Sequence, residues 1–291
     1  MAHVPVPVLE IGGTHVSAAV VDSVSWDVTQ QRRLPVDSSG GADAVLDTFA
    51  AAAAALDVPA GSRWGVAMPD PFDYAGGIAL FRDVGKFDAL YGLDVGSALT
   101  RRMPKRPRGF VFVNDADAFI LGEWAHGSAQ GHSRCVGVTL GTGLGSGWLV
   151  DGRVVTDGPG VPELGRARNL TIDGTSLEDV VSRRGIRSAF AAAGGDATLD
   201  VHDIADLASG GDQIARDALE TTFATLGRGL RAALRDFGAE VVVVGGSIAG
   251  SWSLVDPWFR AGLAWPDAPP VLLASHPDEA ALRGAARATL P

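Results

Sequence analysis

The segment VTLGTGLGSGWLVD, residues Val138–Asp151, sets four glycines between apolar runs. A second segment with the same plan, LEIGGTHVSAAVVD, spans Leu9–Asp22. Each reads as an apolar strand, a glycine-rich turn, a second apolar strand and a closing aspartate. Because two matching segments this far apart are not the short-period repeat of a solenoid, the pair predicts two related lobes.

The composition limits the possible classes of protein. A chain of 291 residues with 46% hydrophobic content is long enough for one large or two medium domains. The net charge of −10 argues against a nucleic-acid partner, which requires a clustered positive surface. Cys135 is the only cysteine, which excludes an intrachain disulfide, and no apolar run is long enough to span a membrane. These features predict a cytoplasmic protein with no membrane partner.

Strand-like and helix-like segments alternate along the chain, which predicts an α/β fold. In the longest helical segment, Leu219, Phe223, Leu226, Leu230 and Leu234 recur at three- and four-residue spacing. The predicted strands are Val6–Ile11, Ser17–Val21, Trp64–Met68, Gly109–Val113, Arg134–Leu140, Gly147–Val150 and Glu240–Val244, and the predicted helices include Ala42–Leu56, Ala116–His126 and Ile214–Phe237.

The glycine turns allow two interpretations. Either they are plain hairpin turns, or their backbone N–H groups form a cradle that a phosphate can approach closely because glycine has no side chain. Neither turn fits the dinucleotide or Walker patterns. A third glycine turn follows the apolar run in VVVVGGSIAGS, residues 241–251, and three such turns in one chain favour a nucleotide ligand.

Six segments, taken in order, resemble the ROK family of sugar kinases and repressors, within the sugar kinase/actin-like ATPase superfamily. They are LEIGGTHVSAAVVD, VFVNDADAFILGE, VTLGTGLGSGWLVDGRVV, PELG, GTSLEDVVS and VVVVGGSIAGS. The resemblance implies two ribonuclease-H-like lobes with ATP and a sugar in the cleft between them. It also implies a homodimer.

The expected boundary between the lobes lies near Asp115. Residues 1–114 would form the first lobe, completed by a C-terminal helix within residues 278–291, and residues 115–277 the second. Repressors of the family carry an added N-terminal DNA-binding segment, and the first glycine turn begins too near Met1 for one to be expected here.

The resemblance assigns the glycine turns to ATP and magnesium. Glu10 stands where the family usually has an aspartate that orients hydrated magnesium, and its extra methylene alters that geometry. The nucleotide-binding residues implied are Gly12, Gly13 and Thr14 in the first turn, Gly141, Thr142 and Gly143 in the second, and Gly245, Gly246 and Ser247 beneath adenosine.

Asp115 is the implied general base. It follows a predicted strand, GFVFVN, and precedes a predicted helix, so its carboxylate could take a proton from a sugar hydroxyl. From local sequence alone, a catalytic role for Asp115 and simple capping of that helix by Asn114 or Asp115 are equally well supported. The family pattern favours catalysis by Asp115 and sugar binding by Asn114.

Two further carboxylates match sugar-binding positions. Glu163 lies in a loop rich in proline and glycine, where binding residues are common. Glu178 matches a second such position, with the alternative that Thr175 and Glu178 form a capping box.

Besides Glu10, the chain departs from the family pattern at three places. Arg166 replaces the usual histidine and could pair with Glu163 or meet a charged substrate. The segment ARNLTIDGTSLE has none of the usual cysteines, so no zinc is expected. The usual sugar-binding asparagine has no clear match, although Asp83 or Lys86 occupies its neighbourhood. For Lys86, a surface role is favoured over a ligand role.

The sequence therefore predicts an ATP-dependent hexose kinase that uses magnesium and lacks zinc. Two alternatives stay open. One is a sugar-sensing protein that has lost efficient catalysis, as the changes at Glu10 and Arg166 would permit. The other is a kinase for a different acceptor, such as an amino sugar.

Overall fold

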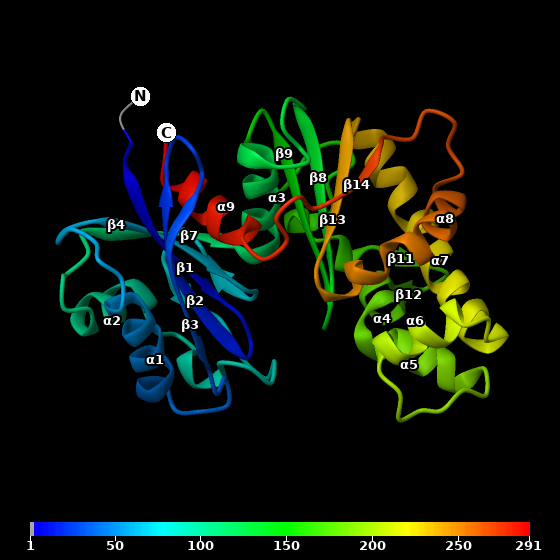
Figure 1. Ribbon diagram of the computed structural model, residues 1–291, viewed down its shortest axis with the longest axis horizontal. Helices are drawn as coiled ribbons and strands as arrows, with labels where there is room; N and C mark the ends of the chain where they lie inside the picture. The colour runs from blue at the N-terminus through cyan, green and yellow to red at the C-terminus, as the bar shows by residue number, and fades with distance from the viewer. Residues whose placement is uncertain (1–2) are drawn as a thin grey trace. The chain divides into compact units, whose positions relative to one another are not determined.

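The computed structural model describes residues 3–291, and its contacts divide the chain into two compact units (Figure 1). The first unit runs to Gln130 and takes in Asp278–Pro291, and the second is Gly131–Pro277. The expected boundary near Asp115 is therefore displaced to Gln130, because the helix that begins at Asp115 packs within the first unit.

The first unit is built on a five-stranded sheet in the order β3-β2-β1-β4-β7. Strands β1, β2 and β3 pair antiparallel, whereas β4 and β7 continue the sheet parallel to β1. The strands are β1 Pro5–Ile11, β2 His15–Asp22, β3 Val28–Pro35, β4 Arg63–Met68 and β7 Gly109–Asn114, with a small hairpin of β5 Phe72–Asp73 and β6 Ile78–Ala79.

The second unit repeats this plan in a sheet of order β10-β9-β8-β13-β14. Strands β8, β9 and β10 pair antiparallel, and β13 and β14 continue parallel to β8. The two glycine-rich repeats of the sequence thus form equivalent hairpins, β1–β2 and β8–β9. The strands are β8 Arg134–Leu140, β9 Leu144–Val150, β10 Arg153–Val154, β13 Val241–Gly245 and β14 Val271–Leu273, with a separate hairpin of β11 Thr171–Ile172 and β12 Thr175–Ser176.

Helices cover the sheets. In the first unit they are α1 Ala42–Ala54, α2 Val95–Arg102, α3 Asp115–His126 and α9 Ala280–Ala288, with the short 3₁₀ turn η1 Asp88–Leu90. In the second they are α4 Leu177–Val181, α5 Arg183–Ala192, α6 Val201–Ser209, α7 Gln213–Phe237 and α8 Trp252–Leu263, with 3₁₀ turns η2 Glu163–Gly165, η3 Ala167–Asn169 and η4 Ser247–Ser251. No helix within residues 3–291 is both long and apolar enough to cross a membrane.

Helix α7 confirms the periodicity read from the sequence. Its apolar stripe, including Leu219, Phe223 and Leu226, is buried in the core of the second unit. The helix ends at Gly238, whose φ of 69° is the left-handed conformation that glycine adopts without strain. Its amide then donates to the carbonyl of Arg235.

Strand β3 was not expected from the sequence. Its residues, VTQQRRLP, are mostly exposed because β3 is the edge strand of the sheet. An edge strand with charged side chains carries no continuous apolar pattern, and this is one way in which proteins prevent edge-to-edge aggregation.

Glycines allow α9 to reach the rest of the first unit, where it lies against α3 (Figure 1). A Cβ atom at Gly284 of α9 would collide with the carbonyl oxygen of Ala118, and one at Gly122 of α3 would collide with that of Ala280. On the sheet side, a Cβ at Gly65 would meet the carbonyl of Ala285. Backbone-to-backbone packing therefore fixes the C-terminal helix.

We expect Gly284→Ala to lower the free energy of unfolding by about 1–3 kcal/mol, because overpacking against a rigid backbone outweighs the gain of about 1 kcal/mol in helix propensity. Gly109→Ala is the matched control, since a Cβ there would meet nothing within 4 Å. It should change stability by less than about 0.5 kcal/mol. Urea denaturation of both variants measures the difference, and equal stability would contradict the packing described.

Candidate active site

Parallel pairing gathers polar residues at one edge of the first unit's sheet. The register places Glu10 beside Ala67, and Ala67 beside Val113. Because β1, β4 and β7 run in the same direction, the segments that follow them emerge at the same edge. Glu10, Asn114 and Asp115 are therefore brought to one end of this sheet.

Asn114 caps helix α3. Its side-chain oxygen accepts hydrogen bonds from the amides of Ala116, at 3.0 Å, and Asp117, at 3.3 Å, and the residue is only 3% exposed. The capping interpretation is thus confirmed for Asn114. Asp115 is the first residue of the helix, and its side chain is exposed.

Tyr74 is a second hydrogen-bond partner of the Asn114 side chain, and the sequence did not reveal it. The Asn114 Nδ2 group donates to the Tyr74 hydroxyl at 3.1 Å. That hydroxyl lies 2.8 Å from Asp70 Oδ1 and 3.0 Å from the carbonyl of Met68, either of which can accept its single proton. Burial raises the pKa of Tyr74, which keeps the hydroxyl protonated. The sequence could have indicated Tyr74 only by its position, because its loop follows β4 at the same sheet edge as Asn114.

Glu10 has an unusual titration. Burial, together with the negative charges of Asp115 and Asp278, raises its pKa to about 7 against the opposing charge of Arg33. Its carboxylate therefore lies in an environment that favours either a proton or a cation.

The turn of the first glycine repeat, Gly12–Thr14, presents unused backbone donors. The Gly12 amide donates to His15 O, and the Thr14 carbonyl accepts from Val36, each at 2.8 Å. The amides of Gly13 and Thr14 have no acceptor within residues 3–291, and both residues are at least partly exposed. Such amides are suited to anion binding.

The equivalent turn of the second unit, Gly141–Gly143, is tied to Glu178. The Gly141 amide donates to Gly143 O at 3.1 Å, and Leu144 N donates to Glu178 Oε2 at 2.7 Å. The amides of Thr142 and Gly143 have no acceptor among the described residues. A Cβ at Gly143 would lie 2.5 Å from Glu178 Oε1, so this carboxylate packs directly against the glycine turn.

The capping box that was the alternative for Thr175 and Glu178 is wrong by one position. Ser176 is the N-cap of α4, and its Oγ accepts from the Asp179 amide at 3.1 Å. Thr175 belongs to β12, which pairs with β11 and displaces the start of the helix. The Glu178 side chain is thereby directed to the β8–β9 turn.

A pocket of about 300 Å³ adjoins the same turn within the second unit. Parallel pairing of β8 with β13 sets Gly245 beside Thr139, so the turns after both strands meet. Gly246 has a φ of 89°, and a Cβ there would collide with the Leu140 carbonyl. The pocket is lined by Gly141, Thr142, Arg183, Asp200, Val201, His202, Ser247, Ile248 and Ser251.

Arg183 and Asp200 are pocket residues that the sequence did not indicate. The Arg183 guanidinium donates two hydrogen bonds to the Asp200 carboxylate, from Nε to Oδ1 at 2.7 Å and from Nη2 to Oδ2 at 2.6 Å. The Arg183 amide also donates to the Gly141 carbonyl at 3.1 Å, which links α5 to the glycine turn. A pair brought together from the start of α5 and the N-cap of α6 leaves no local sequence pattern.

The loop of Glu163 and Arg166 is anchored by Ser146 on β9. Ser146 Oγ donates to Gly165 O at 2.7 Å and accepts from Ala167 N at 2.8 Å. Glu163 is exposed, whereas Arg166 is 7% exposed. The loop therefore presents the carboxylate while it buries the arginine.

The cysteine-free segment ARNLTIDGTSLE includes the β11–β12 hairpin. Its turn residues, Asp173 and Gly174, both have positive φ, which is typical of a tight two-residue hairpin turn. The next residue after the hairpin, Leu177, is fully buried in the core. The absence of zinc stays a prediction.

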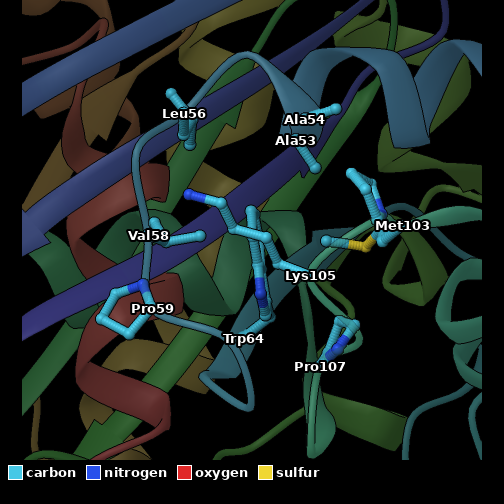
Figure 2. Close-up of a pocket in the computed structure, with 10 residues that line it drawn as sticks. Ala53, Ala54, Leu56, Val58, Pro59, Trp64, Met103, Lys105 and Pro107 are labelled. Carbon is cyan, nitrogen blue, oxygen red and sulfur yellow. The ribbon is translucent and has the colours of Figure 1, made fainter.

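A second cavity is too small to be the site. Figure 2 shows it between the end of α1 and the loop after α2, lined by apolar groups that include Trp64 and Met103. It leaves about 20 Å³ for the centre of a water molecule, roughly the space of one water. None of the predicted site residues lines it.

A model of the ROK family matches residues 7–290. The chain belongs to the ROK family. A glucokinase from Thermotoga maritima is 27% identical over 263 residues, which cover 83% of this chain and 81% of the relative. An N-acetyl-D-glucosamine kinase from Pectobacterium carotovorum is 26% identical, with coverage of 95% and 96%.

The fold of this ROK protein matches that of a solved ROK hexokinase from Thermus thermophilus. The TM-score is 0.79 at 26% identity, with 98% of this chain and 97% of the hexokinase covered. The predicted fold class, α/β lobes of the actin-like ATPase type, is confirmed.

We expect the stability of the protein to fall between about pH 4.5 and pH 7 through Glu10. Its folded-state pKa of about 7 lies above the usual glutamate value of 4.5, so the native state binds the proton more tightly, and stability is lost as the pH rises. Glu10→Gln removes this titration. The free energy of unfolding of the variant, relative to that of the wild type, should be higher at pH 8.5 than at pH 5 by up to about 3 kcal/mol.

Denaturation of both proteins at the two pH values, in chelator, measures the effect. Groups other than Glu10 titrate in both proteins and cancel in the difference. A stability difference that is the same at pH 5 and pH 8.5 would show that Glu10 ionises normally.

Proposed function

We propose that the protein transfers the γ-phosphoryl group of ATP to a hydroxyl of a hexose. The observation that carries the proposal is the position of Asp115. Asp115, whose side chain is exposed, is the first residue of α3 and lies at the same sheet edge as Glu10. Glu10 comes shortly before the Gly12–Thr14 turn, whose amides are unused. A base beside an anion-binding turn is the arrangement that phosphoryl transfer to an alcohol needs.

In the proposed step, the Asp115 carboxylate accepts the proton of the attacking hydroxyl. The hydroxyl oxygen forms a bond to the γ-phosphorus, and the bond from that phosphorus to the β,γ-bridging oxygen breaks, which releases ADP. Asn114 acts chiefly as a positioning residue. Its side-chain oxygen is used by two helix amides and one of its N–H groups by Tyr74, so one N–H remains for a sugar hydroxyl.

The residues present fit a nucleotide. The amides of Thr142 and Gly143 lack acceptors, and the adjoining pocket of about 300 Å³ lies at the small end of the range for ligand sites. We assign this pocket to adenosine, with Ser247 beneath it. The paired Arg183 and Asp200 would offer polar groups to the ribose.

Glu10 fits a magnesium ion held through water. Burial and, after it, the negative charges of Asp115 and Asp278 raise its pKa, and a divalent cation would relieve the repulsion among these carboxylates. When bound, the ion would neutralise charge on the phosphates. Glu10 itself would orient the water ligands.

For the acceptor, we assign Glu163 to sugar hydroxyls, because its carboxylate is exposed on an anchored loop. An amino sugar is the second candidate, supported by the related N-acetyl-D-glucosamine kinase. The roles of Arg166 and Glu178 toward the sugar, the cytoplasmic location and the homodimer stay predictions.

Asp115→Asn tests the mechanism. Asparagine keeps the shape and serves nearly as well at a helix start, but it cannot accept the proton. We expect kcat to fall about 10²- to 10⁴-fold, while the dissociation constants of nucleotide and sugar change little. Steady-state kinetics and calorimetry measure the two quantities.

Asp212→Asn is the matched control. Asp212 caps α7 by accepting from the Ala215 amide at 2.8 Å, and it has no role assigned in catalysis or binding. It should keep wild-type kcat. Turnover by Asp115→Asn at the wild-type rate would refute the assigned base.

A further inference from the structure

Lys86 lies against the first phosphate turn. Its Cδ atom is 3.9 Å from the position that a Cβ would take at Gly13. The aliphatic stem therefore crosses the face of the turn that glycine leaves open, and the ammonium group is two bonds further on. This proximity is what separates Lys86 from the surface role that the sequence favoured.

The ammonium group of Lys86 has no counter-ion in the described part of the chain. It forms no hydrogen bond or ion pair with any residue between 3 and 291, although the side chain is half-buried and the net charge is −10. The other lysine in the sequence, Lys105, pairs with Asp57 at 2.9 Å. An unpaired cation in an acidic protein is conspicuous because partly buried charges are ordinarily paired.

The loop that carries Lys86 is fixed on both sides. On the N-terminal side of Lys86, the amides of Val84 and Gly85 donate to the carboxylate of Asp88. After Lys86, Phe87 is fully buried against Phe49 and Phe81, and its amide donates to Ser38 O at 2.6 Å. The lysine is thus held in place without using its charge.

We propose that Lys86 binds the oxygens of the phosphoryl group in transfer, together with the amides of Gly13 and Thr14. This inference rests on the proposed function and adds a catalytic residue to it. The lysine donates hydrogen bonds and forms no covalent bond. Its fixed positive charge would stabilise the negative charge that develops on the phosphoryl oxygens and the leaving oxygen in the transition state, which accelerates transfer.

Lys86→Met, which keeps the stem and removes the charge, should lower kcat about 10²-fold. Lys86→Arg should recover part of this loss, and Lys105→Met should stay within about twofold of the wild type, because its charge serves an exposed ion pair. Melting temperatures of the three variants confirm that each is folded. A kcat for folded Lys86→Met within twofold of the wild type overturns the proposal.

Amine labelling supplies a readout that does not depend on turnover. The intact protein is reductively methylated with and without the magnesium complex of a non-hydrolysable ATP analogue, and the modified peptides are quantified by mass spectrometry. We expect the analogue to slow methylation of Lys86 at least tenfold and to leave that of Lys105 unchanged. Equal rates at Lys86, with binding of the analogue verified by calorimetry, overturn the proposal.

The two measurements separate this inference from the function on which it rests. An active wild type with an insensitive Lys86 removes only the inference. A wild type that binds the analogue and protects Lys86 but phosphorylates no sugar removes the kinase assignment and supports the phosphate contact. Failure to bind the analogue removes both.

Discussion

The structure depends on parallel strand pairing in both sheets. Parallel pairing of β1, β4 and β7 brings Glu10, Asn114 and Asp115 to one edge of the first sheet. In the second sheet, parallel pairing of β8 with β13 brings together the turns that contain Gly141 and Gly246. The register of the strand ladders sets these positions along the chain. The raised pKa of Glu10 is a consequence, because the same register buries it near Asp115.

Glycine serves two different purposes in this framework. At Gly65, Gly122 and Gly284 it allows backbones to approach closely, so that the C-terminal helix packs into the first unit. At Gly13 and Gly143 it leaves open the face of a turn, against which Lys86 and Glu178 then pack. The side chain at each turn differs in charge, so the two related turns have distinct electrostatic surroundings.

The sequence predicted the parts of the fold that have a periodic or repeated signal. The two hairpins, the buried strand β13 and the apolar stripe of α7 could all be read directly, because burial selects apolar residues at regular spacing. Strand β3 could not, because an exposed edge strand has no such pattern. The boundary at Gln130 depends on packing of α3 with α9, which only the folded chain reveals.

The candidate site was predicted where local motifs were sufficient. The turns and the Asn114–Asp115 pair have a recognisable local context, and the structure brings Glu10, Asn114 and Asp115 to one edge. Tyr74 and the Arg183–Asp200 pair were not assigned, and Lys86 was expected at the surface, because contacts between distant segments leave no local sequence pattern. Glu178 shows the same limit, because a hairpin shifted the helix cap by one residue.

Transfer of phosphate by the wild-type protein tests the central claim most directly. The protein would be incubated with magnesium and ATP and, in parallel, D-glucose, other hexoses or N-acetylated amino sugars, with the products followed by phosphorus NMR. We expect ADP and a sugar phosphate ester in equal amounts, formed only when an acceptor is present. Sugar binding by calorimetry without any ester would contradict it and would identify a sensor instead.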